Sequence, residues 1–440
     1  MTADTIAALA TAPGAGALAV IRISGPAALA IGEQLSGLQP QPRRVHLARF
    51  RDGTGRLIDE GLLLYFPAPH SFTGETVVEL QGHGGLAVSQ LLLQTVIAAG
   101  ARLAEPGEFS KRAFLNGKMD LAQAEAVADL INARSFSAVR AANRSLQGDF
   151  SRAVNELAAE LLQLRLYLEA ALDFPEEEID FLSDGKLAAR LADWLARLAT
   201  LLRQLDQGRL LNEGIKLVLA GQPNVGKSSL LNALLGEERA MVSATAGTTR
   251  DVIREQLLIA GMPVQILDTA GLRSGGDELE REGMRRARAA LEQADLALWL
   301  VDGSRLPDYE EPPTLPAATL KIYSKADLVP AERRAEYRDG LWLSTKDGSG
   351  LEELKTAIAA RVGLRSDEEA PFIGRERHRQ ALLRAQSLGQ QALAQLQGLR
   401  LPELVAEDLR RSHEALGAIT GRVSADELLG EIFSSFCIGK

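Results

Sequence analysis

The stretch GQPNVGKSS, residues 221–229, constrains the fold of this chain more than any other feature. It fits the pattern G-x-x-x-x-G-K-S, running from Gly221 through Gly226 and Lys227 to Ser228. The apolar run IKLVLA precedes it and LLNALLG follows it, so we predict a strand, a glycine-bearing loop and a helix. The backbone amides of such a loop bind phosphate at a helix N-terminus, while the lysine reaches the outer phosphates and the serine ligates magnesium. The sequence therefore predicts a nucleotide-binding α/β domain.

Two downstream motifs predict further contacts to the phosphates. GTTRD offers Thr249 as a second hydroxyl ligand for magnesium. In LDTAG, we expect Asp268 to hold the metal through water and the Gly271 amide to contact the γ-phosphate. Many GTPases orient the attacking water with a glutamine directly after this motif, but here the position is Leu272, which cannot hydrogen-bond. Another group must then position the water.

The motif SKAD, residues 324–327, predicts the base that is bound. Asp327 can accept from both the ring N–H and the exocyclic amine of guanine, a donor pair that adenine lacks. We expect Lys325 to cover the base with its aliphatic stem, and STKDGSG, from Ser344, to offer backbone contacts to the guanine oxygen. Because Ser324 stands where asparagine is usual, we expect weaker base binding with guanine selectivity kept through Asp327.

Composition limits the class of protein. At 440 residues, with 46% hydrophobic and 24% charged residues, the chain predicts two to four globular domains. No apolar run approaches the length of a membrane span, the start lacks the positive flank expected of a secretory signal, and a single cysteine fits the reducing cytoplasm. The net charge of −9 argues against a sequence-blind coat for nucleic acid, although a local basic patch stays possible.

The texture of the chain changes along its length and predicts its domains. Residues 1–117 alternate short apolar runs with glycine and proline, which predicts an α+β domain. Residues 118–212 are helical in pattern, and the run from Leu121 to Gln147 has almost no helix breaker, so we predict long helices. Residues 213–365 alternate strands and helices, which predicts a mostly parallel sheet. Residues 366–440 are helical again, so we expect one helical domain with a Ras-like P-loop GTPase domain inserted into it.

Several longer stretches resemble one family, that of the tRNA modification GTPase MnmE, also called TrmE. They are FTGETVVELQGHGG, PGEFSKRAFLNGKMDLAQAEAVADLI, LDFPEEEID, GQPNVGKSSLLNAL, AGTTRD, DTAGLR and the terminal LLGEIFSSFCIGK. The resemblance covers essentially the whole chain. It implies a homodimer that works with an FAD-dependent flavoprotein, MnmG (GidA), in a heterotetramer acting on tRNA. The pair would install an aminomethyl or carboxymethylaminomethyl group at carbon 5 of the wobble uridine.

The resemblance also implies cofactors. A one-carbon unit would come from a tetrahydrofolate derivative, in its 5-formyl or 5,10-methylene form, and FAD would reside only in the partner. GTP hydrolysis would need Mg²⁺ and be activated by K⁺ and by pairing of the GTPase domains. The implied K⁺ ligands are Asn224, Ser243, Thr245 and Thr248, and the implied Mg²⁺ ligands are Ser228 and Thr249.

The implied catalytic residues are Lys227, Glu280 and Cys437. Glu280 would orient the water in place of the missing glutamine. From the residues alone it is one of several solvated acids, with Glu278 and Glu282 close by. The residues expected at GTP are Asn224, Val225, Gly226, Lys227, Ser228, Ser229, Ser243, Thr245, Thr248, Thr249, Asp268, Thr269, Ala270, Gly271, Ser324, Lys325, Ala326, Asp327, Ser344, Thr345 and Lys346.

For the folate, the resemblance implies Arg22, Glu79, Lys118 and Lys440. A carboxylate suits the amine-rich pterin edge, and cations suit the glutamate tail. Arg22 alone would be interpreted as an ordinary strand arginine facing solvent. Cys437 is either catalytic or a buried small hydrophobe, and the final lysine argues against a prenylated cysteine.

Two rival functions remain to be separated. A GTP-switched ribosome-assembly or RNA-binding factor would share the GTPase motifs but lack the N-terminal domain and the CIGK end. Folate binding by residues 1–117 would distinguish the two. A folate enzyme with a degenerate nucleotide domain is disfavoured by the intact Lys227, Ser228, Thr249 and Asp268.

Overall fold

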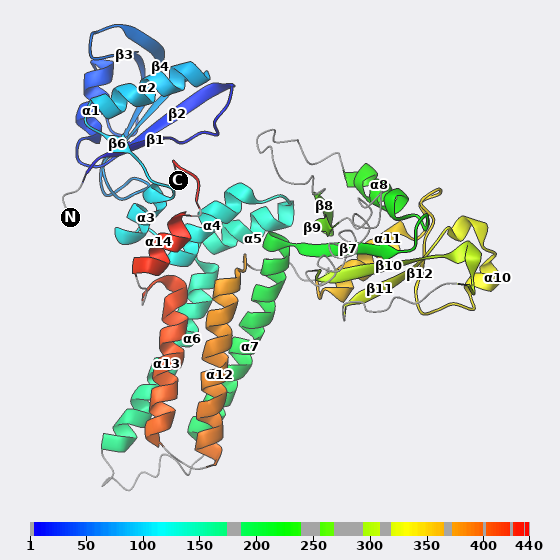
Figure 1. Cartoon of the computed structure of the whole chain (residues 1–440). Helices are drawn as coiled ribbons and strands as arrows, with labels where there is room; N and C mark the ends of the chain where they lie inside the picture. The colour runs from blue at the N-terminus through cyan, green and yellow to red at the C-terminus, as the bar shows by residue number, and fades with distance from the viewer. Residues whose placement is uncertain are drawn as a thin grey trace, which may run out of the picture. The chain divides into compact units, whose positions relative to one another are not determined.

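A computed structural model describes residues 4–173, 186–238, 256–267, 294–308, 318–364, 372–398, 402–422, 426–434 and 436–439 (Figure 1). The chain forms two compact units: the terminal unit, residues 1–128 and 414–440, and the central unit, residues 129–413. No helix in these described ranges is both long and apolar enough to cross a membrane.

The terminal unit contains a six-stranded sheet in the order β3-β4-β5-β2-β1-β6. Neighbouring strands are antiparallel except β1 and β6, which run parallel. The strands are β1 (Ile6–Leu9), β2 (Gly16–Ser24), β3 (Val45–Arg51), β4 (Leu57–Phe66), β5 (Val77–Gly84) and β6 (Arg102–Leu103). The helices α1 (Ala28–Ser36), α2 (Leu86–Ala98) and α3 (Glu108–Leu115) complete the predicted α+β arrangement.

The two faces of this sheet have different chemistry because side chains alternate along a strand. Ile21 and Ile23 of β2 are fully buried in the core that α1 and α2 build on one face. Arg22, between them, therefore points to the other face. There Phe109 of α3 and the adjoining Phe72 pack together in a smaller apolar cluster. A charged side chain thus lies on a face that is otherwise partly apolar.

The end of the chain packs within the same unit. In α14 (Asp426–Ser434), Phe433 joins a buried cluster with Leu121 at the start of α4 (Leu121–Asn132). Phe433 and Phe114 have ring centroids 6.4 Å apart. The C-terminal helix is therefore part of the same core as α3.

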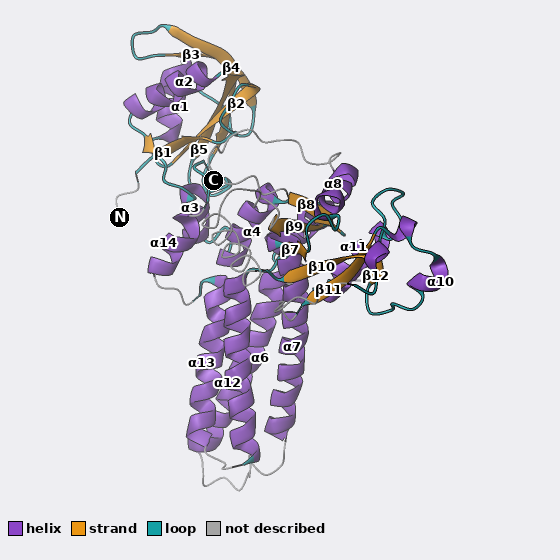
Figure 2. Cartoon of the chain, turned by 45° about the vertical axis from the view of Figure 1, so that its right-hand side comes forward, coloured by secondary structure: helices purple, strands orange, loops and turns teal. Residues whose placement is uncertain are grey.

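The helices of the central unit form a bundle in which α6, α7, α12 and α13 run side by side in both views (Figure 2). They are α5 (Phe136–Leu146), α6 (Asp149–Asp173), α7 (Lys186–Glu213), α12 (Glu376–Gln397) and α13 (Pro402–Thr420). The buried Trp194 donates its ring N–H to the Leu157 carbonyl at 2.9 Å. Gly389 of α12 allows this ring to approach, since a Cβ there would lie 2.7 Å from it. The two helical stretches therefore pack together, as the sequence predicted.

One expectation about these helices was too simple. The run from Leu121 to Gln147 is not continuous, because α4 ends at Asn132 and α5 begins at Phe136. The Ser135 hydroxyl caps α5 by accepting from the Ala138 amide at 3.1 Å. A serine before an apolar run is a helix-start signal, and it outweighs the helical propensity around it.

The second sheet of the central unit has the order β12-β11-β10-β7-β9-β8 and is parallel except for the β8–β9 hairpin. Its strands are β7 (Ile215–Gly221), β8 (Gln256–Ile259), β9 (Met262–Leu267), β10 (Leu296–Asp302), β11 (Thr319–Ser324) and β12 (Leu341–Trp342). The helices α8 (Lys227–Glu238) and α11 (Leu351–Arg361) bury Leu230, Leu234, Leu354 and Ile358 in the core of this sheet. The short elements η1 (Gly303–Arg305), η2 (Ala326–Leu328) and α10 (Ala331–Arg334) connect the remaining strands. This is the predicted P-loop architecture.

Candidate functional site

The phosphate loop joins β7 to α8 in the predicted order. Gly221 has φ 146°, and a Cβ there would lie 2.5 Å from the Leu300 carbonyl oxygen of β10, so only glycine fits. Asn224 and Gly226 also have positive φ, at 61° and 106°. These conformations turn the chain so that α8 begins at Lys227, with its free amides facing the loop.

Lys227 spans this loop. Its Nζ donates to the Gly221 carbonyl at 2.6 Å and to the Gln222 carbonyl at 2.8 Å. Ser228 and Ser229 follow in the first turn of α8, and both are exposed, whereas Val225 is buried under the loop. The loop therefore carries one ammonium, two exposed serines and the free amides of a helix N-terminus, which are the groups that a phosphate-binding loop uses.

The residues of the SKAD motif lie beside that loop at the end of β11. The buried Ser324 hydroxyl lies 2.7 Å from the Val225 carbonyl oxygen and 3.1 Å from the Val301 carbonyl oxygen. Its single hydrogen is thus shared between the phosphate loop and β10. The backbone N–H of Ala326, two residues after Ser324, donates to the Leu343 carbonyl at 3.1 Å. Hydrogen bonds therefore connect the SKAD motif to the phosphate loop and to the segment at Leu343.

Asp327 lies against the loop from Ser344 to Lys346. The buried Ser344 hydroxyl donates to Asp327 Oδ1 at 2.9 Å, and the Lys346 ammonium lies 4.0 Å from Asp327 Oδ2. Ser344 also accepts from the Lys346 amide at 3.3 Å, which shapes the loop. Thr345 between them is exposed. The carboxylate expected to read guanine is therefore held by a neighbouring loop.

Sequence reasoning missed Asp302, the last residue of β10. Its Oδ2 accepts from Lys325 Nζ at 2.6 Å, and its Oδ1 accepts from the Ser304 amide at 3.1 Å and hydroxyl at 2.6 Å. Burial opposes ionisation of Asp302, but the hydrogen bonds from Lys325 and Ser304 outweigh it, so its pKa lies below the usual value. The signal was an aspartate directly after a buried strand, in LWLVDGS.

Several predicted residues lie outside the described part of the chain. The roles predicted for these residues from the sequence stay predictions. They are Ser243, Thr245, Thr248, Thr249, Asp268, Thr269, Ala270, Gly271, Glu280 and Lys440.

In the terminal unit, Arg22 and Glu79 face each other across β2 and β5. Both Nε and Nη2 of Arg22 lie 2.9 Å from Glu79 Oε1, and both side chains are mostly buried. The Arg22 guanidinium also lies over the rings of Phe72 and Phe109, at 5.3 and 5.9 Å from their centroids. Arg22 is therefore not an ordinary solvent-facing strand arginine.

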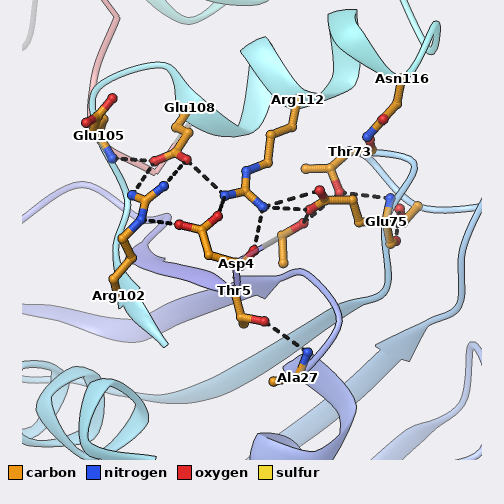
Figure 3. A network of polar contacts seen from close by, with 12 residues as sticks. Asp4, Thr5, Ala27, Thr73, Glu75, Arg102, Glu105, Glu108, Arg112 and Asn116 are labelled. Atoms are coloured by element: carbon orange, nitrogen blue, oxygen red, sulfur yellow. Dashed lines mark hydrogen bonds and ion pairs between the residues drawn. The ribbon is translucent and has the colours of Figure 1, made fainter. Parts of the chain in front are cut away.

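A larger polar network supports the segment that carries Phe72 (Figure 3). Arg112 of α3 donates to both oxygens of Glu75 at 3.2 Å and to Asp4 Oδ1 at 2.6 Å. Arg102 pairs with both oxygens of Glu108, at 2.6 and 2.9 Å. These contacts fix α3, the first residues described and the segment before β5 as one body.

The remaining predicted residues of this unit hold two of its loops. Lys118 donates to the Pro69 carbonyl at 3.1 Å, and the neighbouring Asn116 donates to the Thr73 carbonyl at 2.8 Å. Cys437 is exposed, and its carbonyl accepts from the Gly107 amide at 3.3 Å, just before α3. The alternative that Cys437 is a buried small hydrophobe is therefore wrong.

A parallel sheet with this loop, Lys227 and a base-side aspartate defines the class of P-loop GTPases. The family model described as "MnmE helical domain" matches residues 121–437, and "GTP-binding protein TrmE N-terminus" matches residues 5–118. The chain is 55% identical to the tRNA modification GTPase MnmE of Dichelobacter nodosus over 449 residues, covering 99% of each chain. It is 51% identical to that of Hydrogenovibrio crunogenus over 448 residues, covering 100% of this chain and 99% of the relative. The chain belongs to the MnmE family of tRNA modification GTPases.

Among solved structures, the chain is similar to Era from Aquifex aeolicus bound to GDP.AlF4-. The TM-score is 0.27 and the sequence identity is 24%, over 40% of this chain and 66% of that chain.

Proposed function

We propose that this chain is a potassium-activated GTPase that modifies the wobble uridine of certain tRNAs at carbon 5, together with the FAD-dependent MnmG (GidA) protein. A homodimer of the chain would join that partner in a cytoplasmic heterotetramer. The added group would be aminomethyl or carboxymethylaminomethyl, with its carbon from a tetrahydrofolate derivative. The observation that carries the proposal is that one chain of this family combines the Lys227 phosphate loop with the Arg22–Glu79 pair.

The phosphate loop offers suitable ligands for two cations. Ser228, exposed in the first turn of α8, presents a hard oxygen that suits Mg²⁺, with Thr249 as its expected second protein ligand. Asn224 is exposed in the phosphate loop, and its side-chain amide offers an oxygen that suits a monovalent cation. It would hold K⁺ with Ser243, Thr245 and Thr248. When bound, K⁺ supplies positive charge where an arginine finger acts in other GTPases.

The protein residues would then act as follows. Lys227 exchanges its bonds to the Gly221 and Gln222 carbonyls for bonds to the outer phosphate oxygens of GTP. Asp327 accepts from the guanine edge. Glu280 orients the attacking water, in place of the glutamine that Leu272 replaces. Hydrolysis drives opening and closing of the GTPase domains and leaves the carbon chemistry to the other site.

The terminal unit suits a folate. Among the described residues, the hydrogen bonds of Glu79 use Oε1, so Oε2 is available for the amines of a pterin. The partly exposed ring of Phe72 lies under Arg22 on the same face and offers an apolar contact for a flat heterocycle, whereas Phe109 is fully buried behind it. Lys118 and Lys440 would attract the glutamate tail. A bound folate supplies the one-carbon unit, and the exposed Cys437 thiol is available for chemistry on it.

Two measurements test this proposal. GTP turnover by the unaltered protein is expected to be slow in sodium and much faster in potassium, and Asn224→Ala should remove the difference. Equal rates in both salts for the unaltered protein would exclude the K⁺ site. Titration of the full chain with 5-formyltetrahydrofolate is expected to show binding that Glu79→Ala weakens. A protein with potassium-stimulated turnover but no folate binding would instead fit a GTP-switched ribosome-assembly factor.

A further inference from the structure

The base-side lysine is held in an unusual conformation. Lys325 has φ 57°, a left-handed backbone that non-glycine residues adopt rarely and at an energetic penalty. Such a conformation persists only where neighbouring contacts fix it. The contact that reaches the end of its side chain is the one from Nζ to Asp302 Oδ2, at 2.6 Å.

Asp302 is placed to serve this contact by the register of the sheet. It is the last residue of β10, directly opposite Ser324 of β11, so it stands beside the SKAD motif. Its side chain is 12% exposed and that of Lys325 is 36% exposed. A pair this short and this shielded from water is stronger than an exposed surface ion pair. Arg305, 69% exposed and 3.8 Å away, is a weaker competitor for the same oxygen.

The two carboxylate oxygens of Asp302 have separate tasks. Oδ1 accepts from the amide and the hydroxyl of Ser304, and through these bonds Asp302 caps the η1 turn. Oδ2 accepts from Lys325. An amide at this position could keep the first task through its oxygen while losing the second, because its nitrogen would face an ammonium. The chemistry of one residue therefore allows the turn and the ion pair to be separated.

We infer that Asp302 is a positioning residue for the guanine nucleotide: it anchors the Lys325 ammonium so that the aliphatic stem of Lys325 lies over the face of the base. This inference rests on guanine-nucleotide binding by the SKAD motif, as in the proposed function. Asp302 itself reads no edge of the base, because that task belongs to Asp327. Asp302 raises nucleotide affinity through the contact of Lys325 with the face of the base. It should therefore raise the affinity for every purine nucleotide that Asp327 can bind.

The test compares nucleotide binding by Asp302→Asn and the unaltered full-length protein, using calorimetric titration with GDP and with IDP. Asp302→Asn is expected to weaken both nucleotides by about tenfold, as for loss of one charge-assisted hydrogen bond. The ratio of GDP to IDP affinity should stay constant, because only Asp327 contacts the amine that IDP lacks. In turnover, KM for GTP should rise about tenfold while kcat changes by less than about twofold.

Ser304→Ala is the matched control. It removes one donor to Oδ1 but leaves the Asp302–Lys325 pair in place, so GDP affinity should change less than about twofold. Equal losses in Ser304→Ala and Asp302→Asn would show that Asp302 only shapes the turn, which overturns the inference. Unchanged GDP affinity in Asp302→Asn, or a collapse of the GDP to IDP ratio, would overturn it as well. Failure of the unaltered protein to bind GDP would instead overturn the proposed function.

Discussion

Asp129 and Arg375 are 246 positions apart in the chain and form a two-point ion pair. Arg375 Nη2 lies 2.6 Å from Asp129 Oδ1, and its Nε lies 3.2 Å from Oδ2. Asn212, at the end of α7, donates to the same Oδ1 at 3.3 Å. The start of α12, which follows the strands of the GTPase sheet in the chain, is thus joined to the ends of α4 and α7, which precede those strands. This cluster therefore joins helices that lie before and after the GTPase sheet in the chain.

Removal of Arg375 should destabilise the central unit. In Arg375→Ala, the buried Asp129 carboxylate loses its cation, and we expect unfolding to become easier by about 3 kcal/mol. The measurement is denaturant unfolding of the full chain, followed by the fluorescence of the buried Trp194 and the other tryptophans. The control is Arg152→Ala, whose exposed pair with Asp149 should contribute less than about 0.5 kcal/mol. Equal losses in both variants would contradict the role given to the Asp129 pair.

Much of the GTPase site could be predicted because its chemistry is written in short, contiguous motifs. Lys227, Ser324 and Asp327 follow strands that periodicity identifies, and parallel strands bring their ends to one edge of the sheet. The contacts between segments could not be predicted in this way. The Ser324 bond to Val225 and the Lys325 bond to Asp302 depend on the order and register of β7, β10 and β11, which no local pattern contains.

In the terminal unit, too, the sequence alone could not predict how residues from different segments contact one another. Arg22 and Glu79 were predicted as folate-binding residues from the family resemblance. The residues alone favoured an arginine that faces solvent. The structure places them in register on adjacent strands, at a face with two phenylalanine rings. Cys437 could not be placed from its sequence at all, because a thiol near a chain end is equally suited to burial and to chemistry. In the structure Cys437 is exposed, although Phe436 beside it is buried in the cluster that also contains Phe433.

The network around Arg112 should make the terminal unit sensitive to acid. Burial opposes the charge on Glu108, but the bonds from Arg102, from the Glu105 amide and from Arg112 outweigh it, so its pKa lies below the ordinary 4.5. Because the folded pKa is lowered, the stabilisation is fully present above about pH 4.5 and is lost as the pH falls through the lowered value. Glu108→Gln should therefore exchange deuterium faster in α3 near pH 7.

The same exchange measurement at the acid end of a pH series supplies the contrast, since Glu108 becomes protonated in the unaltered protein as the pH falls through its lowered pKa. The difference between the two proteins should shrink there, and comparison at equal pH removes the intrinsic pH dependence of exchange. Glu60→Gln, which breaks the exposed pair with Arg49, should change little at either pH. A difference for Glu108→Gln that does not depend on pH would argue against an ionic contribution.

Ser324→Asn should tighten guanine-nucleotide binding. Serine offers one hydrogen, which is shared by the Val225 and Val301 carbonyls, whereas an asparagine amide offers two donors and an acceptor. We expect GDP affinity to rise by roughly threefold to tenfold in calorimetric titration, with the ratio of GDP to IDP affinity unchanged. Ser324→Ala, which loses the tie to the phosphate loop, should bind GDP more weakly than the unaltered protein. If the asparagine variant binds no tighter, Ser324 already meets the needs of this site.

The two sites of the chain should be coupled in one direction only. Cys437 belongs to the terminal unit, whereas Glu280 belongs to the central unit, so either could be dispensable if GTP merely stabilised the fold. In the proposed function, hydrolysis-driven movement is part of modification, while the carbon chemistry occurs elsewhere. Cys437→Ser should therefore keep potassium-stimulated GTP turnover and lose tRNA modification.

Glu280→Ala should lose both activities although its folate site is intact, and Glu278→Ala should keep both, because only Glu280 is expected to orient the water. The decisive assay is reconstitution with the flavoprotein partner, a folate, an amine donor and tRNA, in which GTP turnover and the modified nucleoside are measured together. Nucleotide affinity of Glu280→Ala should remain close to that of the unaltered protein, since the lost interaction acts mainly in the transition state. Full modification by Glu280→Ala, with hydrolysis shown to be absent, would mean that turnover and modification are independent.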